Sequence, residues 1–88
     1  MAYGLMISDR LDKIFGKLLK KDRKQLEIIN KKVEEIRENP THYKPLRGDM
    51  AGTREVHIDK SFVLTYEIDG QNKTVRLLDY DHHDKIYQ

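Results

Sequence analysis

The sequence predicts a small α+β domain in which an N-terminal strand and an α-helical hairpin pack on an antiparallel sheet, in the order β-α-α-β-β-β. Apolar residues recur with helical spacing before Pro40 and alternate with a period of two after it. Helices and sheet would each expose an apolar face alone, so each is expected to cover the other. The chain has 88 residues, and we expect one domain spanning residues 1–88.

The first half of the chain carries the signals of a strand and two helices. Residues 3–7 are short and apolar, which is typical of a strand. Ser8 and Asp22 can each accept hydrogen bonds from free amides at the start of a helix, and Asn39-Pro40 ends the second one. The expected buried stripes are Leu11, Ile14, Phe15, Leu18 and Leu19 in the first helix, and Leu26, Ile29, Val33 and Ile36 in the second.

The second half predicts three strands joined by hairpin turns. The expected strands are Thr53–Ile58, Phe62–Ile68 and Thr74–Tyr80. In the first of them Arg54, Val56 and Ile58 share one face, whereas Glu55 and His57 share the other. If the apolar face of the second strand meets the helices, the opposite sheet face is polar, open to solvent and carries His57.

Composition narrows the function classes. There are 17 basic and 15 acidic residues, and this net charge of +2 does not establish a nucleic-acid partner. Residues 1–50 nevertheless hold twelve Lys or Arg against eight Asp or Glu, which fits either RNA binding or a solvated helix face. The absence of cysteine excludes disulfides and thiolate catalysis, and no apolar stretch is long enough to span a membrane. We expect a cytoplasmic protein.

Histidines and basic residues form the candidate site. Cleavage of RNA without a metal needs a base for the 2′-hydroxyl proton, cations for the phosphorane charge and an acid for the leaving oxygen. Histidine titrates near neutrality and suits either proton-transfer role. The candidates for proton transfer are His57 and His83, and those for binding RNA or phosphate are His82, Lys44, Arg47 and Arg54. The alternative is that these histidines are incidental surface residues.

The segment around residues 79–84 also allows a metal site. On a strand, Asp79, Asp81 and His83 share one face, and carboxylates and imidazoles are ligands for divalent ions. A three-ligand site there needs a bend or an outside ligand, so we favour a polar strand terminus. We expect neither a metal nor a cofactor.

The ordered motifs resemble those of the RelE/ParE toxin superfamily over nearly the whole chain. The start of the chain, the two basic helices and the strand ending Leu64-Thr65-Tyr66-Glu67-Ile68 are similar to RelE. The YafQ branch is matched by Pro45-Leu46-Arg47-Gly48, Gly52-Thr53-Arg54, His57-Ile58, Phe62 and His83-x-x-x-Tyr87. The resemblance implies the toxin of a type II toxin–antitoxin system: a ribosome-dependent messenger-RNA endonuclease that acts by metal-free 2′-hydroxyl attack. It also implies an antitoxin protein as partner, besides the ribosome and messenger RNA.

The resemblance assigns roles residue by residue. It makes His83 the proton shuttle and His57 a second catalytic histidine. Tyr87 would stack on a base or donate to phosphate. Arg54 matches a family arginine that is either structural or phosphate-binding, and Lys44 stands where the branch has a histidine.

Several family positions carry different residues in this chain. Ser61 replaces an aspartate, and Val63, Asp79 and Asp81 stand where relatives use arginine. Two alternatives therefore remain open. One is a non-catalytic inhibitor of DNA gyrase like ParE, and the other is a degenerate toxin fold that only binds its antitoxin.

Overall fold

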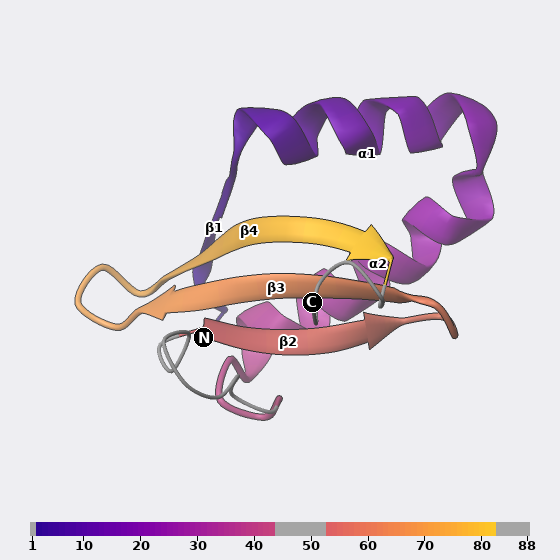
Figure 1. Cartoon of the computed structure of the whole chain (residues 1–88). Helices are drawn as coiled ribbons and strands as arrows, with labels where there is room; N and C mark the ends of the chain where they lie inside the picture. The colour runs from indigo at the N-terminus through magenta and orange to yellow at the C-terminus, as the bar shows by residue number, and fades with distance from the viewer. Residues whose placement is uncertain (1, 44–52, 83–88) are drawn as a thin grey trace.

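A computed structural model describes residues 2–43 and 53–82 and confirms the predicted fold class and element order (Figure 1). The elements are β1 (Gly4–Ile7), α1 (Asp9–Lys21), α2 (Arg23–Glu38), β2 (Thr53–Ile58), β3 (Phe62–Asp69) and β4 (Thr74–His82). The last strand is two residues longer than predicted. None of the helices in the described ranges is long and apolar enough to cross a membrane.

Two predicted caps set the helical hairpin. The Ser8 hydroxyl accepts a hydrogen bond from the Leu11 amide at 3.2 Å, and the Asp22 carboxylate accepts one from the Gln25 amide at 3.1 Å. Asp22 also ends α1, since its own amide donates to the carbonyl of Leu18 at 2.8 Å. The two helices are therefore joined through a single residue.

The sheet has the strand order β1-β4-β3-β2. The pairs β2–β3 and β3–β4 are antiparallel, as predicted, and β1 joins the sheet by running parallel to β4. A parallel neighbour requires a long crossover, and the helical hairpin and the two intervening strands supply it. As a result β1 and β2 are the two edges of the described sheet.

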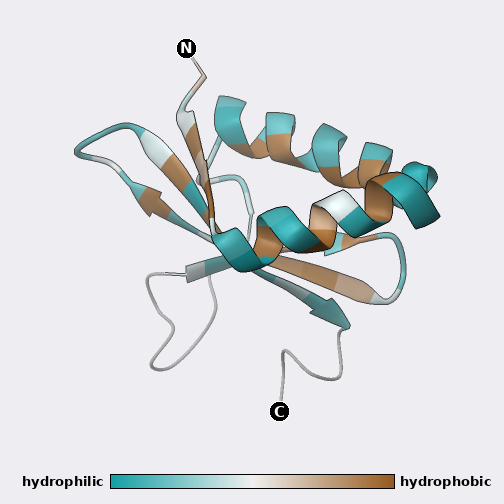
Figure 2. Cartoon of the chain, turned by 90° about the horizontal axis from the view of Figure 1, so that it is seen from above, coloured by the Kyte–Doolittle hydropathy of each residue, from teal (hydrophilic) through white to brown (hydrophobic). Residues whose placement is uncertain are grey.

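Both helices cover the same side of the sheet and turn their apolar sides toward it (Figure 2). The core combines Leu11, Ile29, Val33 and Ile36 from the helices with Val56, Ile58, Leu64, Tyr66, Val75, Leu77 and Tyr80 from the strands. Leu19 is 50 % exposed, so its predicted place in the seam is wrong. Leu26 is only half-buried, and Gln25 takes a buried position instead.

An irregularity in β4 decides which of its side chains face the helices. Thr65 pairs with Asp79 and Tyr66 with Leu77, so Leu78 is an extra residue of β4. Leu77 and Tyr80 therefore both point into the core, although an unbroken strand would turn residues three apart to opposite faces. Beyond the bulge, Asp79 and Asp81 lie on the face away from the helices.

Candidate functional site

His57 lies on the sheet face opposite the helices, as predicted. It is exposed and pairs across the strands with Val63, which in turn pairs with Asp81 on β4. The expectation that this whole face is polar and open is wrong for the central strand. Val63 is 0 % and Thr65 2 % exposed, so a buried strip separates the polar columns of β2 and β4.

Arg54 does not share a face with His57. It pairs with Tyr66, a core residue, and its guanidinium donates to the backbone carbonyls of Tyr43 at 2.7 Å and Thr41 at 3.4 Å. These bonds fix the segment after α2 against β2. Of the two roles that the resemblance left open, the geometry favours the structural one.

The two aspartates of β4 share one basic partner. The Arg10 guanidinium, from the first turns of α1, bonds the Asp79 carboxylate and lies 3.8 Å from Asp81. Arg10 therefore places a positive charge next to β4 on the sheet face that carries His57, but the two carboxylates of Asp79 and Asp81 outweigh it.

Stacked rings support the end of β4. Phe62 lies parallel to Tyr80 with 5.2 Å between ring centroids, and Phe15 of α1 packs edge-on to Tyr80 at 6.2 Å. His82 pairs across the strands with Phe62 and packs edge-on against its ring at 5.6 Å. This pairing puts His82 on the helix side of the sheet, opposite to His57, so the structure does not bring these two histidines together.

The Tyr80 hydroxyl is also fixed. It accepts a hydrogen bond at 2.7 Å from the amide of Gln25, which is only 7 % exposed. Burial raises the pKa of Tyr80, and the bond from Gln25 opposes that rise. The strand that leads to the C-terminal histidine is thus held by a buried polar contact as well as by packing.

Four of the predicted site residues, Lys44, Arg47, His83 and Tyr87, lie outside the described residues. Their predicted roles stay predictions. In the described ranges no group of three or more His, Asp or Glu side chains could hold a metal ion.

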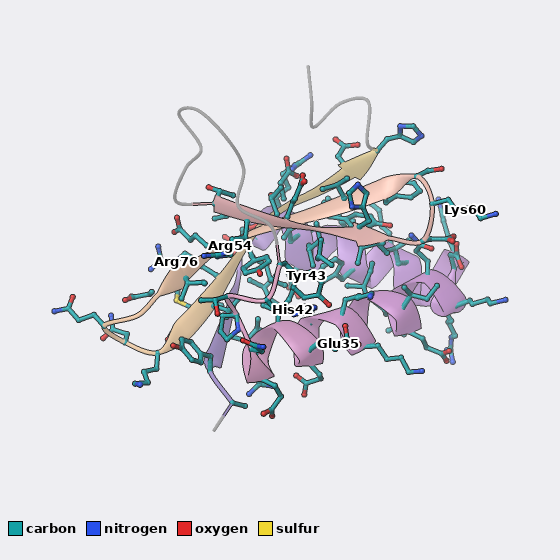
Figure 3. All side chains as sticks on the ribbon, turned by 90° about the horizontal axis from the view of Figure 1, so that it is seen from below. Glu35, His42, Tyr43, Arg54, Lys60 and Arg76 are labelled. Carbon is teal, nitrogen blue, oxygen red and sulfur yellow. The ribbon has the colours of Figure 1, made fainter. Side chains whose placement is uncertain are left out.

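A hollow that the sequence did not predict lies beside His57. It measures about 250 Å³ and is lined by Lys32, Tyr43, Glu55, Val56 and His57. The Tyr43 hydroxyl donates to the Glu35 carboxylate at 2.6 Å, and Lys32 lies 3.6 Å from the same oxygen. Figure 3 shows Glu35 on α2 and Tyr43 between this helix and the sheet. No periodicity marks Lys32 or Tyr43, because the fold brings them to β2 from α2 and the segment that follows it.

Burial and hydrogen bonding shift the pKa values at this hollow. Burial, together with the bond to the Glu35 carboxylate, raises the pKa of Tyr43 to about 12. The same bond lowers the pKa of Glu35, and the positive charge of Lys32 lowers it as well. Tyr43 is therefore a neutral hydrogen-bond donor at neutral pH, and Glu35 is ionised.

Lys60 was also missed from the sequence. It projects from the turn between β2 and β3, at the same end of the sheet as His57 and the last residue of β4 (Figure 3). This exposed cation could approach a phosphate held at that end.

Comparison with known proteins identifies the family. Residues 5–88 match the model of the ParE-like toxin of type II bacterial toxin–antitoxin systems. The chain belongs to this family. It is 54 % identical over 86 residues, 98 % of its own length and 92 % of the other chain, to "Putative toxin RelE4" of Methanocaldococcus jannaschii. The protein is accordingly the toxin of a type II toxin–antitoxin system, and its partner is an antitoxin.

Solved structures of the family share the fold. The YoeB/ParE toxin from Agrobacterium tumefaciens superposes with a TM-score of 0.83 at 20 % identity, over 91 % of this chain and 98 % of that one. The toxin–antitoxin complex RelBE2 from Mycobacterium tuberculosis gives a TM-score of 0.78 at 25 % identity, over 94 % of this chain and 100 % of that one. The predicted membership of the RelE/ParE superfamily is thus confirmed for this toxin.

Proposed function

We propose that this toxin is a ribosome-dependent messenger-RNA endonuclease that cuts by metal-free attack of a 2′-hydroxyl on the adjacent phosphate. One histidine takes the 2′-hydroxyl proton while another group protonates the leaving 5′-oxygen, and cations stabilise the phosphorane. His83 is the proposed shuttle, with His57 as its partner. Tyr87 would stack on a base or donate to the phosphate.

The observation that carries this proposal is the placement of His57. It is exposed on the face away from the helices, where its column is separated from Asp81 by one strand. Two strand spacings amount to about 10 Å. His83 follows Asp81 by two residues, a length of chain that spans at most about 7 Å. Covalent connectivity therefore allows His83 to reach a phosphodiester beside His57.

The outer surface of α1 supports binding to ribosomal RNA. Apart from Arg10, which is paired with Asp79, its exposed basic residues are Lys13, Lys17, Lys20 and Lys21. Lys17 follows Lys13 by four residues and precedes Lys20 and Lys21 by three and four, so these lysines lie along one side of the helix. Such a stripe attracts a polyanion at long range and makes the binding salt-dependent. Binding of ribosomal RNA to α1 would leave the sheet face away from the helices available to the messenger.

A cell-free translation reaction with purified toxin tests the proposal. Messenger cleavage is mapped by primer extension for the wild type, His83→Ala and His57→Ala. His42→Ala is the matched control, because His42 is an exposed histidine on the segment after α2. We expect cuts within translated codons that His83→Ala abolishes, that His57→Ala reduces roughly 100-fold, as befits loss of a general acid or base, and that the control retains.

Intact messenger with the wild type would refute the endonuclease. If His83→Ala cleaved as much messenger as the wild type, only the role of His83 as proton shuttle would be refuted. Unfolding of each variant in urea shows whether a lost activity reflects a lost fold.

Inhibition of DNA gyrase is the second candidate function. The observation that favours it is the acidic column of β4, where Asp79 and Asp81 outweigh Arg10 on the face that a phosphate would approach. A non-catalytic inhibitor needs no proton shuttle and tolerates that charge. Inhibition of purified gyrase in a supercoiling assay, with messenger left intact, would establish this function in place of RNA cleavage.

A further inference from the structure

The outer edge of β2 has no neighbouring strand in the described sheet. β2 is the last strand in the order, and its six residues pair with β3 alone in an unbroken register. Edge strands present unpaired N–H and C=O groups to any extended chain that comes alongside. Proteins often protect such edges with proline, lysine or a bulge. β2 contains none of these, although Arg54 holds the segment after α2 against this strand.

A groove runs along this edge. The hollow beside His57 shares Lys32 and Tyr43 with a second one of about 650 Å³. The second hollow is lined in addition by Glu34, Glu35, Glu38, Asn39 and His42. Because two side chains line both, we treat the hollows as one feature, the β2–α2 groove.

The groove is acidic. Four glutamates line it, Glu34, Glu35, Glu38 and Glu55, against one lysine, Lys32. Arg37 neutralises part of this charge through its ion pair with Glu34. The remaining excess of negative charge favours a segment that carries Lys or Arg and repels a nucleic-acid backbone.

Glu55 has a carboxylate oxygen that could accept a hydrogen bond from a binding partner. Its Oε2 atom is almost fully buried at the edge strand and has no hydrogen-bond partner in the described residues. A buried carboxylate oxygen without a donor costs free energy that an incoming N–H group or cationic side chain would recover. The same side chain lines the hollow next to His57.

We propose that the β2–α2 groove binds a basic, extended segment of the antitoxin, which adds to the outer edge of β2 and covers His57. Main-chain hydrogen bonds to β2 supply affinity, and the acidic groove selects side chains of opposite charge. If the toxin is the endonuclease proposed above, this docking silences it by covering the surface beside His57, one of the two proposed catalytic histidines.

Charge-neutral variants of the groove test the contact. The probe is the antitoxin itself, purified with the full chain as an equimolar complex and then separated from it. Glu35→Gln/Glu55→Gln removes two charges but keeps an acceptor for the Tyr43 hydroxyl. Asp9→Asn/Asp12→Asn is the matched control, since it removes two carboxylates from α1.

The expected result is a dissociation constant raised about tenfold or more for the groove variant, which corresponds to about 1.4 kcal/mol. The control should change it less than threefold. Equal affinities for the groove variant and the wild type would overturn the proposal.

Hydrogen–deuterium exchange locates the added strand. In the complex the amides of Thr53–Ile58 should exchange at least tenfold more slowly than in the free toxin. The competing edge is β1, where Met6 is 55 % and Ile7 40 % exposed. Protection confined to Gly4–Ile7 would overturn the proposal, and so would protection of β2 by single-stranded RNA in place of the antitoxin.

The binding and exchange measurements need no catalytic activity, so docking can be judged even if the toxin cuts no RNA. If it does cut, the groove variant should cleave messenger in the presence of an antitoxin concentration that silences the wild type. Without antitoxin, cleavage by neither protein would refute the endonuclease while leaving the docking result standing. If both proteins cleave without antitoxin and both are silenced at that concentration, the docking proposal is overturned.

Discussion

Replacement of Arg54 separates the two roles that its family position allows. Arg54→Met keeps most of the aliphatic stem and removes every donor, whereas Arg54→Lys keeps the charge but loses the planar fork. If the residue is structural, both variants lose stability and neither loses cleavage per folded molecule. If it binds phosphate, Arg54→Met loses cleavage while stability stays constant.

The magnitude follows from two contacts. The guanidinium donates at 2.7 Å to the Tyr43 carbonyl and at 3.4 Å to that of Thr41. A hydrogen bond from a charged donor contributes about 1.5–3 kcal/mol, and the longer bond is weak. Arg54 is half-buried and Thr41 exposed, so water can replace part of the loss. We therefore expect Arg54→Met to lower the free energy of unfolding by about 2 kcal/mol.

Urea unfolding at neutral pH measures this directly. In thermal unfolding, the melting temperature of a domain of this size should fall by about 8–16 °C. Arg54→Lys should lie between Arg54→Met and the wild type, because an ammonium can still reach one carbonyl. Unchanged unfolding of Arg54→Met together with loss of messenger cleavage would refute the structural role.

Two further predictions concern buried hydroxyls. Burial raises the pKa values of Tyr43 and Tyr66 to about 12, so these two side chains should ionise about two pH units above an ordinary tyrosine when absorbance near 295 nm is followed. Because the folded pKa exceeds the unfolded one, the stability they confer is complete below pH 10 and is lost as the pH rises from about 10 to about 12; Tyr43→Phe should remove one late ionisation, and a titration in which Tyr43→Phe removes no late step would contradict the assignment. Tyr80→Phe should destabilise the fold by about 1–3 kcal/mol, since it leaves the buried amide of Gln25 without an acceptor. The double variant Gln25→Met/Tyr80→Phe should recover part of that loss, and strictly additive losses would show that the two side chains do not interact.

Local chemistry allowed most of the fold to be predicted from the sequence. Ser8 and Asp22 cap the helices where the pattern predicts it, because capping depends only on a side chain and amides three residues away. The alternation in β2 likewise predicted that His57 points away from the helices. These features are fixed within one turn of helix or one strand.

The features that were missed depend on partners far away in the sequence. Without a bulge, Leu77, Asp79 and Asp81 would share one face, which would place two carboxylates beside the core. The extra residue at Leu78 separates them, but period-two reasoning cannot detect it, since the bulge is visible only against β3. Gln25 is similar, because its burial makes sense only once the Tyr80 hydroxyl is known to lie opposite.

The charge around β4 constrains the proposed chemistry. Arg10 places a guanidinium beside Asp79 and Asp81, yet these two carboxylates leave that cluster net negative. A phosphorane carries additional negative charge and would be repelled there. Arg10 is therefore a positioning residue, which ties the start of α1 to the end of β4. If this toxin cuts RNA, we expect Lys60 and the predicted Lys44 and Arg47 to stabilise the transition state, and neutralising these three should cost more activity than removing Arg10.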